Sequence, residues 1–309
     1  MKKISVFAPA TVSNIACGFD TFGFAIEGPG DIVSATIDES FRGLKISKIS
    51  GDEGRLPLDV SKNTAGIAVL ALLDKIEYHG GIDLQIEKKM PFASGLGSSA
   101  ASAAAAVHAV NELLDQPLKK IELLPFIIKS ETSIGGTEHA DNAAPSLLGG
   151  FVLVRSLDPV DIINLPIPED LHYAVVHPQV EINTGESRQT LPQNIPLKTA
   201  VKHWANTASI VQALNNGDLD LLSRSVEDFV AEPVRSKNIP FYAKAKNQAM
   251  SSGAIACNIS GSGPSIFAFC DSIAAAQKVS SVMELVYKEN EIGCTSYFGK
   301  IRRKGAEII

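Results

Sequence analysis

The stretch PFASGLGSSAASAAAA, residues 91–106, decides the fold because it joins a glycine loop to a helix of small residues. The preceding residues 81–91, GIDLQIEKKMP, place their apolar side chains on one face of an extended strand. Ser98 and Ser99 are residue types that commonly cap helices, and the alanine-rich run from there to Leu114 strongly favours a helix. The stretch therefore predicts a strand, a tight loop and a helix.

This loop has the features of a phosphate cradle. Gly95 and Gly97 allow the backbone to approach a ligand closely, and we expect the amides near residues 98–101 to point outward from the helix start. A helix end contributes about 0.3–1 kcal/mol to anion binding, or up to about 2 kcal/mol when partly buried. Because this is too little to neutralise a triphosphate and the loop has no Walker lysine, a divalent metal ion must share the charge. A tight turn that binds nothing remains the structural alternative.

The same residues also fit a dinucleotide-binding fingerprint. GLGSSA matches G-x-G-x-x-[G/A], and Asp115 stands 20 residues after Gly95. However, Asp115 closes the predicted helix, whereas the acid of a dinucleotide-binding fold ends a second buried strand, and Pro91 interrupts the junction of strand and glycines. The pattern is thus a poor match to an NAD(P)-dependent oxidoreductase.

The rest of the chain alternates strands and helices. Strands are predicted near 2–8, 24–37, 44–49, 151–156, 172–177 and, as a pair around a glycine loop, 255–270; helices are predicted near 63–76, 118–132, 272–288 and, as two or three helices, between 199 and 252. A polar loop, a short helix ending at the glycines 149–150 and a last strand complete the order. This order predicts an α+β fold with helices packed on one face of a mixed sheet. The pattern resets near residue 160, which predicts an N-terminal domain over 1–160 and a C-terminal domain over 161–309.

Composition excludes several classes of protein. The 309 residues carry 28 Lys and Arg against 34 Asp and Glu, a net charge of −6, so no basic surface is expected for a nucleic-acid partner. The four cysteines lie far apart without a CxxC pair, which favours reduced thiols. The N-terminus lacks the apolar run of a signal peptide, and no run approaches the roughly 18 apolar residues of a membrane span. We expect a cytoplasmic protein with no membrane partner.

Three segments resemble the signature motifs of the GHMP kinase superfamily, the small-molecule kinases named for galactose, homoserine, mevalonate and phosphomevalonate. They are APATVSNIACGFDTFG at 8–23, PFASGLGSSAA at 91–101 and ISGSGPSIFAF at 259–269. Within the superfamily, the chain is most similar to the homoserine kinases, with the likeness running over essentially the whole length. Four shorter stretches carry it: SNIACGFD at 13–20, HADNAAP at 139–145, TGESR at 184–188 and EPVR at 232–235.

The resemblance implies a fold and a reaction. The implied fold is a two-domain GHMP kinase: an N-terminal ribosomal-S5-domain-2-like domain with a left-handed βαβ unit, a C-terminal ferredoxin-like α+β domain, and an active site between them. The implied activity is that of an ATP:L-homoserine O-phosphotransferase, with ATP as donor, Mg²⁺ as cofactor and O-phospho-L-homoserine as a product for threonine biosynthesis. Relatives also suggest a homodimer.

The resemblance assigns the nucleotide and metal residues one by one. Ser99 and Glu131 would bind Mg²⁺, with Ser98 as an alternative to Ser99. Read from the residues alone, Glu131 would be a solvated helix acid. The proposed nucleotide-binding residues are Asn63, Pro91, Phe92, Ala93, Ser94, Gly95, Leu96, Gly97, Ser98, Ser99, Ala100 and Ala101, with Asn63 at the adenine pocket and also a candidate helix cap.

The resemblance likewise assigns the substrate residues. Arg188 and Arg235 would hold the carboxylate of homoserine, beside Thr184 and His139. Asn14 and Asp141 would take the ammonium group. Asp20 and Asn142 would contact the phosphate-accepting hydroxyl, and the residues proposed as catalytic are Asp20, Asp141 and Asn142. The general base stays open, since a loose transition state leaves little for a base to do. The residues alone leave surface ion pairs for the arginines, and turn or cap roles for Asn14, Asn142 and Asp20, as alternatives.

Three other functions compete with this interpretation. A sibling kinase would phosphorylate mevalonate, which has a carboxylate but no ammonium group, or a sugar. A catalytically silent module would keep the fold and bind without turnover, although the set of Ser99, Glu131 and Asp141 argues against it. The dinucleotide-dependent oxidoreductase is the third.

Overall fold

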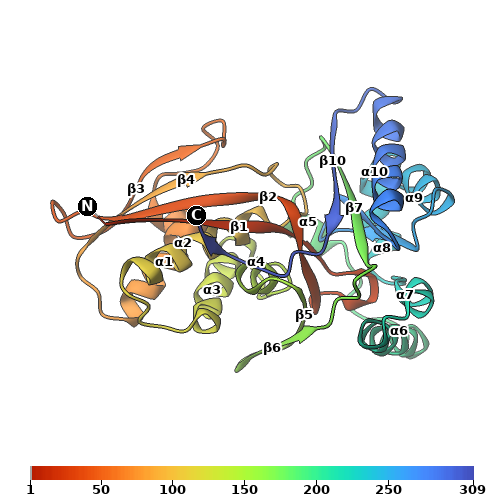
Figure 1. Cartoon of the computed structure of the whole chain (residues 1–309), viewed down its shortest axis with the longest axis horizontal. Helices are drawn as coiled ribbons and strands as arrows, with labels where there is room; N and C mark the ends of the chain where they lie inside the picture. Colours follow the sequence, from red (N-terminus) through yellow and green to blue (C-terminus); the bar gives the residue numbers. More distant parts are fainter. Residues whose placement is uncertain (1) are drawn as a thin grey trace.

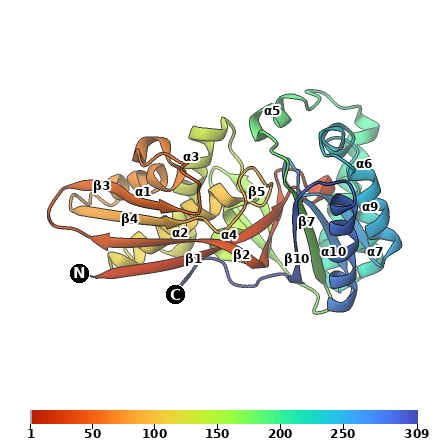
Figure 2. The same cartoon turned by 90° about the horizontal axis from the view of Figure 1, so that it is seen from above.

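The chain is built around two β-sheets, each covered by helices (Figure 1). The computed structural model describes residues 2–309, except that the side-chain surroundings of residues 135 and 184 lie outside the description. The first sheet and its helices fill one half of the molecule, and the second sheet with its helices fills the other (Figure 2). The α+β class is confirmed, but two sheets replace the single mixed sheet that the order of elements predicted.

The first sheet has seven strands, ordered β11-β1-β2-β4-β3, with β5 paired to β2 and β6 paired to β5. Their bounds are β1 Lys3–Ser13, β2 Phe22–Ile37, β3 Gly43–Ser50, β4 Gly81–Glu87, β5 Phe151–Leu157, β6 Val160–Leu165 and β11 Glu307–Ile308. β3 and β4 are parallel, and the chain between them forms α1 (Thr64–Lys75), so these three elements form a βαβ unit. The other neighbours in this sheet are antiparallel.

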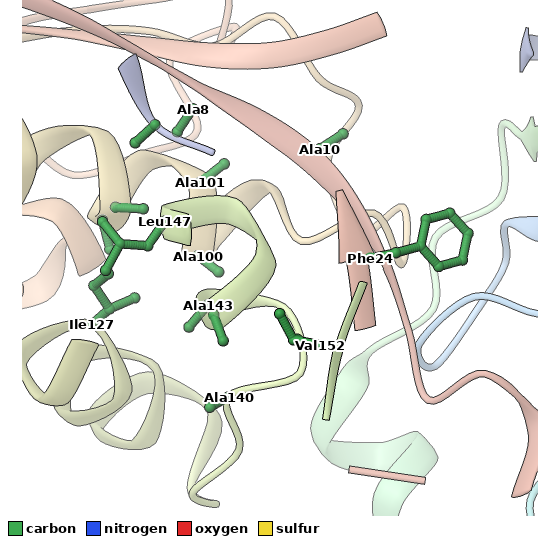
Figure 3. Packing of buried hydrophobic residues seen from close by; sticks show 14 of the residues in the cluster. Ala8, Ala10, Phe24, Ala100, Ala101, Ile127, Ala140, Ala143, Leu147 and Val152 are labelled. Atoms are coloured by element: carbon green, nitrogen blue, oxygen red, sulfur yellow. The ribbon is translucent and has the colours of Figure 1, made fainter. Parts of the chain in front are cut away.

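Helices α2 (Ser98–Leu113) and α4 (Ala143–Leu148) pack with α1 against this sheet, and α3 (Leu124–Gly135) packs against these three helices. The alanines of α2 are buried, and their small side chains allow the helix to lie close to β1 and β2. Figure 3 shows Ala100 and Ala101 of α2 gathered near Ala143 and Leu147 of α4. The helix-forming run recognised in the sequence is thus the centre of the first core.

The second sheet is antiparallel, in the order β10-β7-β9-β8. Its strands are β7 His172–Pro178, β8 Ala256–Ile259, β9 Ile266–Cys270 and β10 Cys294–Lys300. Helices α9 (Tyr242–Ser251) and α10 (Ile273–Lys288) contact this sheet (Figure 2), and their buried residues share a second core with Ala174 and Val176 of β7. Alternate residues of the same strand belong to the first core, so β7 is buried on both faces, as strands between two layers are.

An aromatic cluster joins the two sheets. Phe24 of β2 lies 5.4 Å from Phe269 of β9 and 5.6 Å from Phe151 of β5, measured between ring centroids. Tyr173 of β7 and Phe267 of β9 also contact Phe24. Burial of such rings contributes strongly to packing, and tilted or stacked pairs add about 0.5–1.5 kcal/mol each. The cluster therefore links the two halves of the chain.

Several predicted boundaries are corrected. The helix expected over 118–132 is a 3₁₀ turn, Lys120–Leu123, followed by α3, because Pro125 fits only the first turn of an α-helix. Helix α2 is capped by Gly97 in the left-handed conformation, so the prediction that Ser98 and Ser99 cap it is wrong. Asn63 does cap α1, as predicted: its side chain accepts from the Ala65 amide.

The remaining elements lie in the connections between strands of the same sheet. They are the 3₁₀ turns at Ala16–Gly18, Val60–Lys62 and Ser236–Asn238, and the helices α5 Thr184–Gln189, α6 Leu197–Asn216, α7 Leu219–Ser225 and α8 Glu232–Arg235. Between residues 199 and 252 the structure thus has α6, α7, α8 and α9 where two or three helices were expected.

The chain leaves the first sheet after Leu165 and returns to it at β11. The division into domains at residue 160 stays a prediction. Within residues 2–309, no helix has the length and apolar character needed to cross a bilayer.

Candidate active site

A cavity of about 590 Å³ collects residues from all three signature segments. Its lining residues fall within 13–20, 56–64, 86–102, 131–142, 183–188, 235 and 261–262. The walls therefore come from β1, the glycine loop, α3, the residues before α4, α5, α8 and the β8–β9 loop. No single segment of the sequence contains this site.

The glycine loop is held by the third signature segment. The Ser260 hydroxyl donates to the Gly95 carbonyl at 2.7 Å, and the Ser265 amide donates to the Ser94 carbonyl at 3.3 Å. The first segment is attached as well, since the Gly261 amide donates to the Ser13 carbonyl at 3.1 Å. The third segment thus packs its backbone against the glycine loop.

The proposed phosphate cradle is only partly exposed to the cavity. Phe92, Ala93, Ser94, Gly95, Gly97, Ser98 and Ser99 line it. Pro91 lies outside the lining, and the side chains of Leu96, Ala100 and Ala101 are buried in the core. The Ala101 amide donates to the Gly97 carbonyl at 2.9 Å, so this amide is already used within the helix. The amides of residues 98–100 precede it and have no carbonyl within the helix to bond.

The hydroxyl groups of the two adjacent serines point to different acids. Ser99 donates to Glu131 of α3 at 2.5 Å, whereas Ser98 donates to Asp31 at 3.2 Å. Glu131 is partly exposed toward the cavity, and the surrounding protein raises its pKa by desolvation. A hydroxyl and a carboxylate are oxygen ligands of the kind that Mg²⁺ takes together with water and phosphate oxygens. In residues 2–309 no three His, Cys, Asp or Glu side chains form a metal-binding cluster, so protein ligands alone do not complete a metal site.

A buried ion pair that contacts the start of α2 was not predicted from the sequence. Lys88, one residue after β4, donates to Asp31 of β2, to the Ser98 carbonyl at 3.0 Å and to the Ser102 hydroxyl at 2.7 Å. Both charged side chains are almost fully buried, 3% and 0% exposed, and desolvation lowers the pKa of Lys88. Asp31 also accepts from the Lys89 amide at 3.0 Å. The only sequence signal was the lysine pair before Met90, which resembles an ordinary charged strand end.

Asp141 is an acidic residue in the wall of the cavity and lies beside Asn14 and His139. Asp141 is 2% exposed and accepts from the Asn14 amide at 3.2 Å, and the His139 ring nitrogen Nδ1 lies 3.4 Å from its other oxygen. Burial lowers the pKa of His139, but hydrogen bonding and the charge of Asp141, with the charges of Glu131 and Asp20, outweigh it and raise the pKa. The buried carboxylate thus faces the cavity with a protonatable partner.

Asn142 and Asn14 have structural contacts of their own. The Asn142 side-chain oxygen accepts from the Thr11 hydroxyl at 2.7 Å, and the Asn14 side-chain oxygen accepts from the Asp20 amide at 3.0 Å. Asn14 and Asp20 adopt positive φ values of 70° and 58°. Non-glycine residues rarely do so, and such conformations often occur at functional sites.

Two arginines lie over the ring of one phenylalanine. The guanidinium carbons of Arg188 and Arg235 lie 5.3 Å and 5.2 Å from the centre of Phe19. Arg188 donates to both oxygens of Asp20, while Arg235, 4% exposed, donates to the Gly261 carbonyl at 2.8 Å. Thr184 begins α5, and its side chain lies outside the described residues.

Asn63 lines the same cavity, on the segment that also contributes Leu56 and Pro57. It is 4% exposed and its amide group donates to the Pro57 carbonyl at 3.1 Å. Phe92 lines the same cavity, with Arg55 over its ring. The role of Asn63 at an adenine base stays a prediction.

Two family models match the chain. Residues 63–150 match the GHMP kinases N terminal domain, and residues 210–289 match the GHMP kinases C terminal domain. With the glycine loop and the two-sheet fold, these matches show that the chain belongs to the GHMP kinase family, and it is accordingly a small-molecule kinase that takes its phosphoryl group from ATP.

Curated relatives that match the chain over nearly its full length are named homoserine kinases. The homoserine kinase of Chlorobium phaeobacteroides is 45% identical over 100% of both chains, and that of Methanococcus maripaludis is 35% identical over 97% of both. A crystal structure of homoserine kinase from Cytophaga hutchinsonii matches with a TM-score of 0.97 and 45% identity, covering 100% of this chain and 98% of that one. The L. major mevalonate kinase, at 16% identity and a TM-score of 0.72, shares the fold.

Proposed function

We propose that the protein transfers the γ-phosphoryl group of ATP to the side-chain hydroxyl of L-homoserine, giving O-phospho-L-homoserine and ADP. The observation that carries this proposal is the placement of two guanidinium groups and a buried carboxylate around one cavity that also contains the glycine loop. An amino acid carries a carboxylate and an ammonium group, so it complements both kinds of charge. The similarity to homoserine kinases supports the same acceptor.

The nucleotide would bind along the glycine loop. The amides of residues 98–100 would donate to phosphate oxygens, and the helix N-terminus would add a favourable field. Leu56, Pro57, Asn63 and Phe92 would surround the adenine base. Ser99 and Glu131 would hold Mg²⁺, which neutralises phosphate charge when bound. Ser98 is less suited to that role because its hydroxyl is bonded to Asp31.

The acceptor would lie between the charged walls. Arg188 and Arg235 would bind the carboxylate, and Asp141 with Asn14 would bind the ammonium group. Asp20 and Asn142 would position the hydroxyl toward the γ-phosphorus. During transfer, the bond from the hydroxyl oxygen to phosphorus forms as the bond to ADP breaks, and the hydroxyl proton is released. In such a reaction the protein mainly positions groups and neutralises charge.

The general base can be tested at Asp20. An Asp20→Asn variant that keeps near-normal turnover would exclude a proton-accepting role, and a loss greater than about a hundredfold would support one. His139 is disfavoured as the base because it is paired with Asp141 at the edge of the carboxylate site.

A direct assay tests the proposed reaction. ADP release would be followed with Mg-ATP and, side by side, L-homoserine, mevalonate and a panel of sugars. Turnover with L-homoserine alone is expected. Turnover with mevalonate or a sugar would keep the kinase and replace the acceptor, while ATP binding without turnover on any acceptor would favour a silent binding module.

We also propose that the enzyme serves threonine biosynthesis in the cytoplasm, consistent with four free cysteines.

A homodimer is proposed as well. Leu197, Val201 and Trp204 recur at helical spacing on α6 and are 70%, 51% and 63% exposed, an apolar stripe of the kind that a second subunit covers. The molar mass from light scattering, in the parent protein and in Trp204→Lys, tests this assembly.

A further inference from the structure

Asp20 forms an ion pair with Arg188, which lines the cavity. Its two carboxylate oxygens accept from the two terminal nitrogens of Arg188 at 2.9 Å and 2.7 Å. This is the bidentate geometry in which a guanidinium group also takes the carboxylate of a ligand. Both side chains line the cavity and are about a quarter exposed, 29% for Asp20 and 27% for Arg188, so a solute can reach the pair.

The second arginine of the site lacks an acidic partner. Among residues 2–309 no carboxylate lies within ion-pair distance of Arg235, whose nearest bonded acceptor is the Gly261 carbonyl. Its Nε atom is buried and makes no hydrogen bond in the described structure. Burial, followed by the charge of Arg188, lowers the pKa of Arg235. Of the two guanidinium groups over the ring of Phe19, only that of Arg188 is paired with a carboxylate, so the positive charge of Arg235 is available to a bound anion.

We propose that Asp20 is a resident substitute for the substrate carboxylate and that the substrate carboxylate displaces it from Arg188. This inference rests on the proposed function for the identity of the acceptor. The incoming carboxylate would take both Arg188 and Arg235, and Asp20 would be free to turn toward the acceptor hydroxyl. Binding of the correct acceptor and the release of a catalytic carboxylate become one event.

The displacement makes acceptor selection depend on the carboxylate. An acceptor that has no carboxylate leaves Asp20 bound to Arg188. Both oxygens of Asp20 then stay in hydrogen bonds with the guanidinium group and do not contact the acceptor hydroxyl. The ion pair that must be broken also opposes binding of the correct acceptor. An exposed ion pair contributes up to about 1 kcal/mol, and a bidentate pair somewhat more, so its removal should tighten carboxylate binding roughly three- to tenfold.

The test separates this role from contact with the hydroxyl. L-2-Aminobutyrate has the carboxylate and ammonium groups of homoserine but no hydroxyl, so it probes the displacement alone. Its dissociation constant would be measured by calorimetry on the full chain, for the parent protein, Asp20→Asn and Asp20→Ser. We expect binding about three- to tenfold tighter in both variants, while kcat/KM for L-homoserine falls. A residue that only stabilises the fold would not give tighter binding of L-2-aminobutyrate together with a lower kcat/KM for L-homoserine.

Four controls complete the experiment. Glu186→Gln removes an exposed negative charge from the same short helix as Arg188 and is expected to leave the dissociation constant unchanged. The amide of L-2-aminobutyrate, which lacks the carboxylate, should gain nothing from Asp20→Asn. The measurements are repeated at about 0.5 M salt, because simple repulsion between Asp20 and the ligand would be screened whereas direct displacement persists. Mg-ATP alone should bind the parent and the variants equally.

Unchanged or weaker binding of L-2-aminobutyrate in both variants would overturn the proposal, as would a gain that vanishes at high salt. A gain in Mg-ATP affinity instead would mean that the arginines take a phosphate group. Because the binding test requires no turnover, it is independent of the assay above: absence of homoserine phosphorylation would overturn the proposed function, whereas failure of displacement would leave that function intact.

Discussion

The Ser260 hydroxyl donates a 2.7 Å hydrogen bond to the carbonyl of Gly95, a residue 165 positions earlier in the chain. The contact holds the glycine loop of the first sheet against the β8–β9 loop of the second. Gly95 has a φ of +72°, and a Cβ atom there would lie 2.5 Å from the Ser260 carbonyl oxygen. The loop therefore has no space for a side chain at this position.

We expect Gly95→Ala to lower kcat/KM by about a hundredfold or more, because the loop must move away from the Ser260 backbone and misplaced phosphates react slowly. The matched control is Gly136→Ala, since Gly136 has a similar φ of +76° with nothing within 4 Å of the added Cβ. That variant should lose only about 1–2 kcal/mol of stability and keep its activity. Equal activity loss in the two variants would mean that backbone strain, not the clash, is decisive.

The buried pair of Lys88 and Asp31 should dominate local stability. Lys88→Met leaves Asp31 buried without its ammonium partner, and we expect a loss of about 3–5 kcal/mol in the free energy of unfolding by urea. Adding Asp31→Asn should recover a large part of that loss. The control, Lys89→Met, removes a 52% exposed lysine paired with Glu87 and should cost less than about 1 kcal/mol. Similar losses in both single variants would contradict the importance of the buried pair.

Ser99 and Glu131 should determine the response to Mg²⁺. Glu131→Gln is expected to raise the Mg²⁺ concentration needed for half-maximal activity and to lower kcat by about a hundredfold, since an electrostatic contact worth about 3 kcal/mol is lost in the transition state. Ser99→Ala should show a smaller change in the same direction. Glu138→Gln, at an exposed residue outside this cavity, provides the control. A normal Mg²⁺ titration for Glu131→Gln would exclude Glu131 as a ligand.

Arg235→Lys should weaken acceptor binding selectively. Lysine keeps the charge but lacks the planar fork that binds a carboxylate through two nitrogens, so we expect KM for the acceptor to rise roughly 10- to 100-fold. KM for ATP should change little. Arg224→Lys alters an exposed arginine paired with Asp220 and serves as the comparison. If KM for ATP rose instead, Arg235 would be a phosphate-binding residue.

Acid should destabilise the protein partly through His177. Burial lowers its pKa from 6.5 to about 4, so between these values the unfolded chain binds a proton that the folded chain does not. Stability should therefore fall as the pH falls from about 6.5 to 4, by up to about 3 kcal/mol for this residue. In His177→Gln the free energy of unfolding should vary less over this range, whereas His79→Gln, at an exposed position, should keep the parent profile. Identical profiles for all three proteins would rule out this source.

Local sequence was sufficient for the elements around the glycine loop. The strand before it, the alanine-rich helix after it and the Asn63 cap of α1 all follow from residue types within a few positions of one another. The helix start was misjudged because two good capping residues followed a glycine. In the folded chain Ser98 and Ser99 instead bond to acids from β2 and α3, which no local pattern indicates.

By itself, the sequence determined which segments fold locally and, through likeness to a family, which residues belong to the candidate site. Only the tertiary structure decided how those residues pair: Lys88 with Asp31 across 57 positions, and Arg188 with Asp20 across 168. The physical reason is the separation along the chain over which each effect acts. Propensity and periodicity act over a few residues, whereas Lys88 meets Asp31 because β2 and β4 pair within the first sheet. Arg188 meets Asp20 because the two sheets pack together through an aromatic cluster and enclose one cavity.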